Sequence, residues 1–197
     1  METTKLEINE NMSIRAIRIF YIAGIPFSLL IAWMVAFFSS QSFADLFLIK
    51  QPLFLQFAIG ASIGSAIALG TGIVILKAPK IQGLRSVISE AYIHFKPKWY
   101  DLFFTALTAG VAEEIVFRRL LQPWAGIVLT SIIFALGHMP TPNTKGKLLM
   151  VGWIFVLGSL LGILFEQFGI YCAIMAHFTI DLILLFFYKV YLQPEPV

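Results

Sequence analysis

Residues 53–76 read LFLQFAIGASIGSAIALGTGIVIL, which is a run of 24 positions without a charged side chain. A helix needs about 20 mostly apolar residues to cross the hydrocarbon core of a bilayer. A transmembrane β-strand would instead alternate apolar and polar residues over about ten positions. Because this run is continuously apolar, it predicts a membrane-spanning helix.

Similar apolar runs lie on both sides of this one, and proline or glycine separates them. The further candidate spans are residues 17–38, 101–121, 124–138, 148–165 and 170–188, of which 124–138 is short. The sequence therefore predicts an all-α, polytopic membrane helix bundle with about six transmembrane helices.

The composition of the chain supports this assignment. Of its 197 residues, 59% are hydrophobic and 13% are charged, whereas a typical soluble domain is about 45–50% apolar and about 25% charged. A disordered chain would need low hydrophobicity and high charge. The single cysteine, Cys172, excludes an internal disulfide and a paired-cysteine zinc motif. The net charge of +3 is small and scattered, which argues against nucleic-acid binding.

The placement of basic residues predicts the orientation of the helices. The connection at residues 77–98 carries five basic side chains and one acidic side chain, and short positive loops stay in the cytoplasm. Both termini are then cytoplasmic, and we expect an integral protein of a bacterial plasma membrane. Arg118 and Arg119 lie toward the outer end of the third span and need a separate explanation.

The same connection has a helical pattern of its own. Between Pro79 and Pro97, apolar residues from Ile81 to Phe95 recur at helical spacing, with polar residues on the opposite face. This pattern predicts an amphipathic interfacial helix between the second and third transmembrane helices. An ordinary connecting helix packed on the bundle would show the same pattern.

A glycine motif in the second span has a structural explanation. Residues 60–64 match the Gly-x-Ser-x-Gly nucleophile elbow, but that motif requires a strand–turn–helix context. Gly60, Gly64, Ala68 and Gly72 recur every four residues, which is typical of close helix packing. We therefore expect this face to pack against another helix.

Ionisable residues inside spans are costly and suggest function. Here they gather in three segments, EEIVFR at 113–118, FALGH at 134–138 and HFTID at 177–181. Residues four apart share a helix face, so Glu114 can pair with Arg118. This pairing would neutralise the arginine that departs from the charge rule.

The remaining ionisable groups could activate water. Glu113 points about 100° away from the ion pair and is free to face a cavity. Phe134 shares a face with His138, and His177 shares a face with Asp181. Glu113 and His138 could hold and deprotonate a water, while His177 and Asp181 stabilise the oxyanion on a peptide carbonyl.

The same residue types are also compatible with three different roles. Glu113, His138, His177 and Asp181 could bind a divalent metal such as zinc that activates the water. These groups could form a structural polar network, in which each bond contributes only about 1 kcal/mol on average. They could also carry protons or ions. The chain has no His-Glu-x-x-His motif of a zinc protease.

The three motifs, in this order, resemble the CPBP family of intramembrane proteases, which includes the CAAX prenyl endopeptidase Rce1 and the bacterial Abi proteins. The family pattern is Glu-Glu-x-x-x-Arg, then Phe-x-x-x-His, then His-x-x-x-Asn or Asp. The resemblance covers about residues 101–188. The catalytic residues that it implies are Glu113, Glu114, Arg118, His138, His177 and Asp181.

The resemblance also implies roles for these residues. Glu113 and His138 would activate the water, His177 and Asp181 would form the oxyanion hole, and the Glu-Arg pair would shape the site. Asp181 often corresponds to Asn in the family, and an ionised carboxylate only accepts hydrogen bonds. Asp181 must therefore be protonated, orient His177 or bind a cation. The family's description as metalloproteases keeps zinc as a candidate cofactor.

The resemblance implies an endopeptidase that acts on a membrane-associated or lipidated substrate in contact with membrane lipid. The alternative is a non-proteolytic membrane protein that gives self-immunity by binding a bacteriocin, or that translocates protons or ions. We expect one membrane domain, residues 1–197, with two accessory spans and the interfacial helix in 1–100 and a four-span catalytic core in 101–188. The sequence leaves the oligomeric state open.

The pairing of Glu113 with His138 must meet a condition on depth. Glu113 lies about 12 Å from Leu121 along its helix, and His138 lies about 21 Å from Trp124, at 1.5 Å per residue. The two side chains then differ in depth by about 9 Å. Helix tilt, or a fourth helix that starts deeper in the bilayer, must close this gap.

Overall fold

The computed structural model describes residues 2–38, 42–47, 51–77, 97–138 and 147–192. These residues form helices and contain no strand. The stretches long and apolar enough to cross a membrane are Ile14–Phe38, Leu53–Lys77, Trp99–Gly137, Leu148–Phe168 and Ile170–Tyr191. The prediction of an all-α polytopic bundle is confirmed, and the chain is an integral membrane protein.

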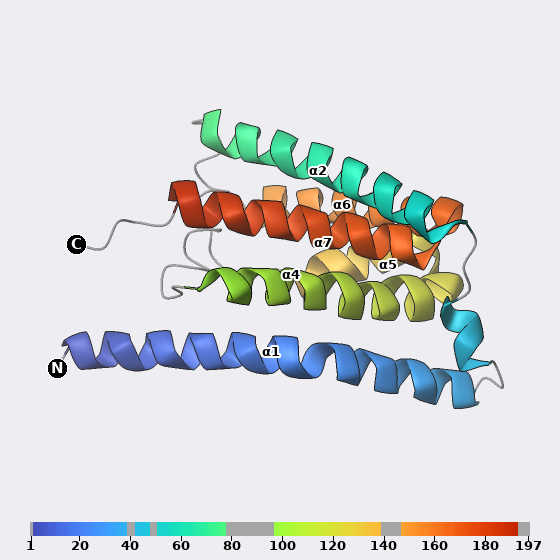
Figure 1. Ribbon diagram of the computed structural model, residues 1–197, viewed down its shortest axis with the longest axis horizontal. Coiled ribbons are helices and arrows are strands. Elements are labelled where there is room, and N and C mark those ends of the chain that lie inside the picture. The colour runs from blue at the N-terminus through green and yellow to red at the C-terminus, as the bar shows by residue number, and fades with distance from the viewer. Residues whose placement is uncertain (1, 39–41, 48–50, 78–96, 139–146, 193–197) are drawn as a thin grey trace.

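The helices run alternately in opposite directions (Figure 1). Their bounds are α1 Glu2–Phe38, the short 3-10 helix η1 Phe43–Phe47, α2 Leu53–Lys77, α4 Trp99–Glu114, the π-helical segment η3 Ile115–Leu121, α5 Gln122–Gly137, α6 Lys147–Phe168, α7 Ile170–Phe187 and the π-helical segment η4 Tyr188–Leu192. The start of α1 and the end of α7 lie at the same end of the bundle (Figure 1). We call it the basic end, because α2 ends there at Lys77, Lys98 precedes α4 and Lys189 lies in η4. Arg18 of α1 also lies near it, since it contacts Asp101 at the start of α4.

The predicted third and fourth spans form one continuous stretch that reverses direction. Gly126 has φ 71° and ψ 171°, which interrupts the helix, and glycine adopts such angles without a Cβ clash. Beyond it the chain runs back along η3, because the rings of Phe117 and Phe134 lie 5.0 Å apart. The part of α5 after this break, residues 127–137, is about 16 Å long. It therefore crosses only about half of the hydrocarbon core.

Two predicted elements compare differently with the structure. The first helix starts at Glu2, well before the predicted start at residue 17, and only its part from Ile14 is apolar enough to span. The predicted interfacial helix, Ile81–Phe95, falls outside the described residues.

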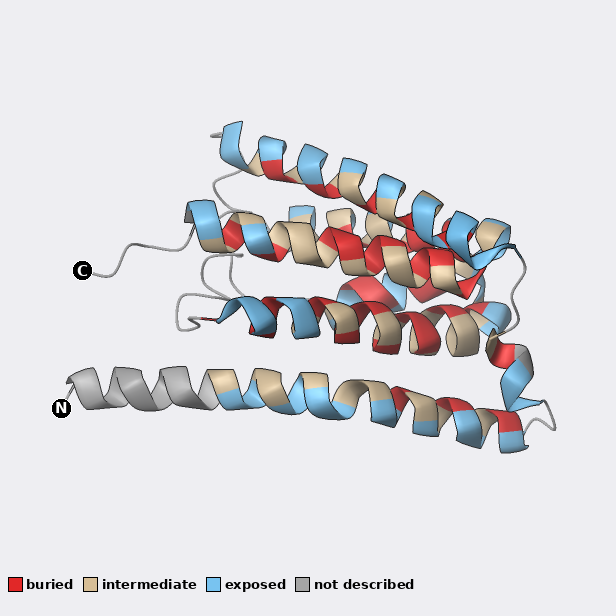
Figure 2. Cartoon of the chain, in the orientation of Figure 1, coloured by how far each residue is buried: buried red, intermediate tan, exposed pale blue. Residues whose placement is uncertain are grey.

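α1 is joined to α4 by polar contacts near the basic end. Asp101 is buried, and one of its carboxylate oxygens lies 3.3 Å from Arg18 Nε and accepts a 3.1 Å hydrogen bond from the Tyr21 hydroxyl. Its other oxygen accepts the backbone N–H of Lys98 at 3.0 Å. Asp101 thus satisfies one of the free N–H groups at the start of α4. The outer face of α1 is largely exposed (Figure 2), as expected for a lipid-facing surface.

α2 packs directly on the backbone of α7, as its small-residue face predicted. Gly60, Gly64, Ala68 and Gly72 are all buried. A Cβ at Gly60 would lie 2.5 Å from the carbonyl oxygen of Cys172, and one at Gly64 would lie 2.6 Å from that of Ala176. Ala176 directly precedes His177, so this contact holds a site-bearing helix in place.

We expect Gly64→Ala to lower the free energy of unfolding by about 1–3 kcal/mol, because the added methyl group overpacks the interface with α7. Gly70→Ala, on the same helix, is the matched control. Apart from the adjoining backbone of α2, no atom of the described residues lies within 4 Å of a Cβ at Gly70, and alanine favours a helix over glycine by about 1 kcal/mol. Thermal unfolding in detergent micelles measures both effects. Equal stability of the two variants would contradict the close contact.

Candidate active site

A fully buried ion pair lies where α4 continues into η3. Arg118 Nε is 3.0 Å from Glu114 Oε2, and both side chains are 0% exposed. The guanidinium also lies over the ring of Phe134, 5.2 Å from its centroid, in a cation–π arrangement. The pairing predicted from the four-residue spacing is confirmed, and it neutralises Arg118 inside a stretch apolar enough to span a membrane.

The same glutamate holds a histidine of α7. Glu114 Oε1 lies 2.8 Å from His177 Nδ1. A carboxylate only accepts, so Nδ1 carries the hydrogen and donates it. This contact joins residues 63 apart, and nothing in the local spacing of either motif indicated it. It fixes the imidazole so that Nε2 faces the other carboxylates of the site.

Glu113 lies between the two histidines. Its Oε2 is 3.5 Å from His138 Nε2 and 4.0 Å from His177 Nε2. This oxygen is shielded from solvent and accepts no hydrogen bond from any of the described residues. An unsatisfied buried acceptor carries a desolvation cost. A water molecule that donates a hydrogen bond to this oxygen would satisfy it.

His138 ends α5 and is oriented by its own helix. Its Nδ1 lies 2.8 Å from the carbonyl oxygen of Phe134. A carbonyl oxygen accepts, so Nδ1 donates, and in the neutral imidazole the lone pair is on Nε2. That lone pair faces Glu113. Two acceptors 3.5 Å apart are well placed to share one water.

The break at Gly126 closes the predicted depth gap. Since residues 122–126 are used in the reversal, α5 starts its return near residue 127. His138 then lies about 16 Å along that helix, against about 12 Å for Glu113 from Leu121. The remaining difference of about 4 Å is less than one helical turn.

Asp181 completes the group on α7. Its Oδ2 is 3.5 Å from His177 Nε2, as the shared face predicted. Nε2 of His177 thus lies between the carboxylates of Asp181 and Glu113. The structure brings all six predicted site residues together, and their catalytic roles stay predictions.

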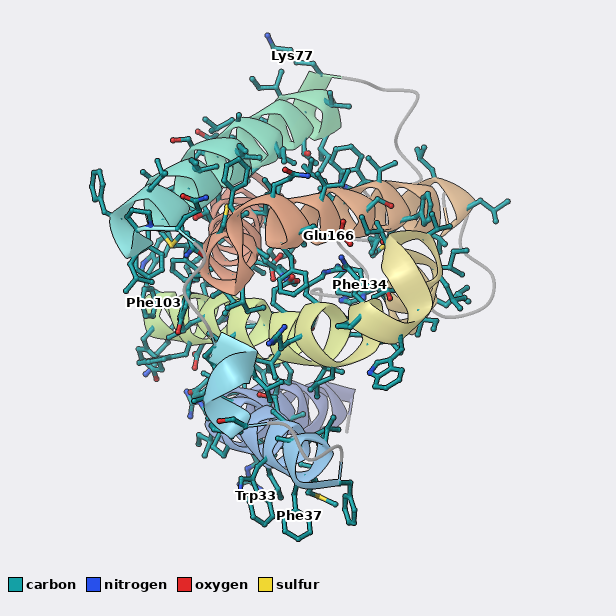
Figure 3. The ribbon with its side chains drawn as sticks, turned by 90° about the vertical axis from the view of Figure 1, so that its right-hand side faces the viewer. Trp33, Phe37, Lys77, Phe103, Phe134 and Glu166 are labelled. Carbon is teal, nitrogen blue, oxygen red and sulfur yellow. The ribbon has the colours of Figure 1, made fainter. Side chains whose placement is uncertain are left out.

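Phe134 contacts both histidines, whereas its four-residue spacing predicted a contact with His138 alone. Its ring centroid is 4.5 Å from that of His138 and 5.9 Å from that of His177. The ring is buried and also meets Phe117 edge-on. Figure 3 shows Phe134 inside the ring of helices, whereas Trp33 and Phe37 point outward from α1. Phe134 therefore packs the two imidazoles from one side.

A cavity of about 360 Å³ connects these groups. Glu113, His138, His177 and Asp181 all line it, and most of its other lining residues are aliphatic or aromatic. A few polar groups converging in a largely apolar cavity are typical of a binding or catalytic site.

The four proposed metal ligands do not form a metal-holding group as placed. Among the described ranges, no set of three or more His, Cys, Asp or Glu side chains is arranged to bind an ion. Each imidazole is held through Nδ1, that of His177 by Glu114 and that of His138 by the carbonyl of Phe134, and Nε2 of both rings remains available, as it also does in metal-binding histidines. Zinc therefore stays a candidate cofactor for these residues.

Part of the chain is similar in sequence to a known protein family. Residues 95–183 match the family described as type II CAAX prenyl endopeptidase Rce1-like. All six predicted site residues lie in this range. The resemblance to the CPBP family is confirmed.

Two curated proteins of Bacillus subtilis (strain 168) are similar to the chain. The sporulation-killing factor biosynthesis protein SkfC is 29% identical over 90 residues, which cover 40% of this chain and 18% of SkfC. The uncharacterized protein YpbD is 33% identical over 81 residues, which cover 41% of each protein. The chain thus matches less than half the length of either relative. No solved structure matches it significantly.

Proposed function

We propose that this chain, whose residues 95–183 form an Rce1-like domain, is an intramembrane endopeptidase that cleaves a membrane-associated or lipidated substrate. The observation that carries the proposal is the position of Glu113. Its shielded, unpaired Oε2 faces Nε2 of both His138 and His177 inside the cavity. A carboxylate and a neutral imidazole that both accept can bind the two hydrogens of one water.

The first step is attack of this water on the peptide carbonyl. Glu113 removes one proton as the water oxygen bonds to the carbonyl carbon. His138 Nε2 accepts a hydrogen bond from the other hydrogen and so orients the attacking lone pair. The carbonyl π electrons move to oxygen, which gives a tetrahedral oxyanion. A general base in this position contributes about 10²–10⁴-fold to the rate.

His177 stabilises the oxyanion. In its imidazolium form, the ring donates Nδ1–H to Glu114, and Nε2–H is available to the oxyanion. Donors fixed before the reaction stabilise developing charge strongly in a water-poor site. Asp181, 3.5 Å from Nε2, favours the charged ring and orients it. Asp181 is therefore a positioning residue that acts through His177, because an ionised carboxylate cannot donate a hydrogen bond to the oxyanion.

The intermediate then collapses. Glu113 gives the proton it took from water to the leaving nitrogen, the C–N bond breaks, and the carbonyl re-forms. The products are a carboxyl group and an amine, and Glu113 returns to its carboxylate form. One water is consumed, and no redox partner is needed.

We propose that the site is reached from the cytoplasmic side of the plasma membrane. Arg18, Lys77, Lys98 and Lys189 lie at or near the basic end of the bundle, and positive residues mark the cytoplasmic side. The cavity also extends toward that end, because Tyr188 of η4 is one of its lining residues. Both termini would then be cytoplasmic, and substrates would enter from the inner leaflet.

The proposal is tested in cells by comparing membrane-associated peptides from the wild type and Glu113→Gln at matched expression. Peptides cut only in the wild type would support a protease and identify its substrate. If both folded proteins give the same peptides, the endopeptidase is contradicted. Bacteriocin protection retained by Glu113→Gln would then indicate immunity by binding. A change of internal pH in proteoliposomes after an acid pulse would indicate proton transport.

We expect cleavage to survive removal of divalent metals, because the described residues include no three-ligand group. The purified protein is dialysed against a chelator, its metal content is measured, and its rate is compared with that of the untreated protein. A rate lost with the metal and restored by zinc alone would contradict the metal-free mechanism.

A further inference from the structure

The catalytic cavity has a wall that comes from outside the Rce1-like part of the chain. Thr71, Gly72, Ile75 and Leu76 line the same cavity as Glu113 and His177. They belong to the last turns of α2, whereas the family match begins at residue 95. We call these four residues the α2 wall. The groups that do the chemistry and this part of their surroundings thus lie on separate segments of the chain.

The α2 wall lies beyond the catalytic groups in the direction of the basic end. α2 and α7 run parallel, because Gly64 contacts Ala176 and Gly72 contacts the ring of Phe187. Gly64 is therefore level with His177. Eight residues separate Gly64 from Gly72, which is about 12 Å along the helix. At about 3.3–3.6 Å per residue of extended chain, a peptide whose scissile bond is held at Glu113 would bring a side chain three to five residues away alongside the wall.

The chemistry of this part of the cavity is apolar. The wall shares the cavity with Trp153 and Leu157 of α6 and with Leu184 and Phe187 of α7. The hydroxyl of Thr71 donates to the carbonyl oxygen of Ile67 at 2.8 Å, within α2. Its hydrogen is therefore already used, and no charged group lies on the wall. An apolar group buried here gains about 25 cal/mol per Å² of surface removed from water.

We infer that the α2 wall determines substrate specificity by accepting an apolar side chain about three to five residues from the scissile bond and limiting its size. This inference rests on the proposed endopeptidase. An apolar wall would also accept a lipid chain attached to the peptide. The experiment therefore distinguishes an apolar side chain from an attached lipid. Continuity with the catalytic cavity favours a side chain, because an extended peptide that runs from Glu113 toward the basic end would pass along the wall.

Gly72 and Phe187 adjust the size of this space. A Cβ at Gly72 would lie 3.0 Å from the Phe187 ring, and both residues line the cavity. A larger residue at position 72 must displace the ring. The absence of a side chain at Gly72 therefore allows the Phe187 ring to pack beside the α2 wall.

The test varies the wall and the substrate together, with the full-length protein in proteoliposomes. The probes are copies of the peptide cut in the cellular comparison, with Ala, Leu, Phe or Trp at the positions about three to five residues from the scissile bond, and one copy with a farnesylated cysteine in that stretch. Ile75→Ala enlarges the cavity. Val74→Ala is the matched control, because Val74 is 48% exposed and does not line the cavity.

We expect Ile75→Ala to shift kcat/KM from Leu toward Phe or Trp by about tenfold, the scale of a small change in a hydrophobic pocket. Val74→Ala should keep the wild-type order. Equal profiles for the two variants would overturn the inference, while cleavage that still depends on Glu113 would leave the proposed function standing. A shift seen only with the farnesylated probe would overturn the side-chain assignment.

A binding measurement keeps the test independent of turnover and of the folding of Ile75→Ala. Ile75→Cys and Val74→Cys are made in the Glu113→Gln background, where Cys172 is buried and protected. The peptide with Leu should slow maleimide labelling at position 75 and not at position 74. Equal labelling at position 75 with and without peptide would contradict a wall that contacts substrate.

Discussion

Glu113→Gln should reduce kcat by about 10²–10⁴-fold, the contribution of a general base, while the protein stays folded. The amide has nearly the shape of the carboxylate but cannot take a proton from water. Glu113 makes no hydrogen bond through Oε2 within the described part of the chain. The substitution therefore breaks no hydrogen bond at Oε2, and the amide fills the same space. Single-turnover cleavage by purified protein measures the effect, and circular dichroism and thermal unfolding check the fold.

Glu113→Asp is the informative control. It keeps the carboxylate but moves it back by one methylene group, away from His138 Nε2, which lies 3.5 Å from Oε2. A misplaced base loses much of its effect, because catalysis depends on alignment within a fraction of an ångström. We expect Glu113→Asp to have a kcat between that of the wild type and that of Glu113→Gln. Wild-type cleavage by Glu113→Gln would remove Glu113 from the mechanism.

Arg118→Ala should destabilise the protein by about 3–5 kcal/mol, because the buried Glu114 carboxylate loses its arginine and keeps only His177 as a partner among the described residues. Arg118 and Glu114 are both 0% exposed and 3.0 Å apart. The truncation also removes the guanidinium from the face of Phe134. Chemical unfolding in mixed micelles measures the loss. A stable and active Arg118→Ala protein would contradict the structural role.

A double variant separates stability from catalysis at this pair. Glu114→Gln with Arg118→Met replaces the ion pair by neutral groups of similar size, which often preserves stability. It also replaces the charged acceptor of His177 Nδ1. We expect the double variant to have a free energy of unfolding close to that of the wild type but a lower rate of cleavage. Recovery of both stability and activity would show that Glu114 does not support catalysis through His177.

Local periodicity predicted the helices and the contacts within one helix. The length of each apolar run set the spans, and four-residue spacing gave the pairs Glu114–Arg118 and His177–Asp181, because such residues share a face. Recurrence of small residues from Gly60 to Gly72 gave the packing face of α2 for the same reason. In each case the physical constraint acts within a few residues of the chain.

Contacts between helices could not be read in this way. The hydrogen bond from His177 to Glu114 and the ring contact from Phe134 to His177 depend on how three helices are placed in space. The count of spans was ambiguous because a single positive φ at Gly126 decides whether residues 99–137 continue or reverse. The contribution of α2 to the cavity has no sequence signal, since its lining residues resemble any lipid-facing residues.

The close contact between α2 and α7 has a consequence for how such a protein can change over time. At Gly60 and Gly64 the backbone of α2 packs directly against that of α7, because neither glycine has a side chain in between. This part of the interface therefore does not depend on interdigitated side chains. Residues such as Ile75 can then be exchanged without repacking the helix that carries His177. New preferences can arise on α2 while the reacting groups stay in register, which makes this helix the natural place to begin a directed-evolution library.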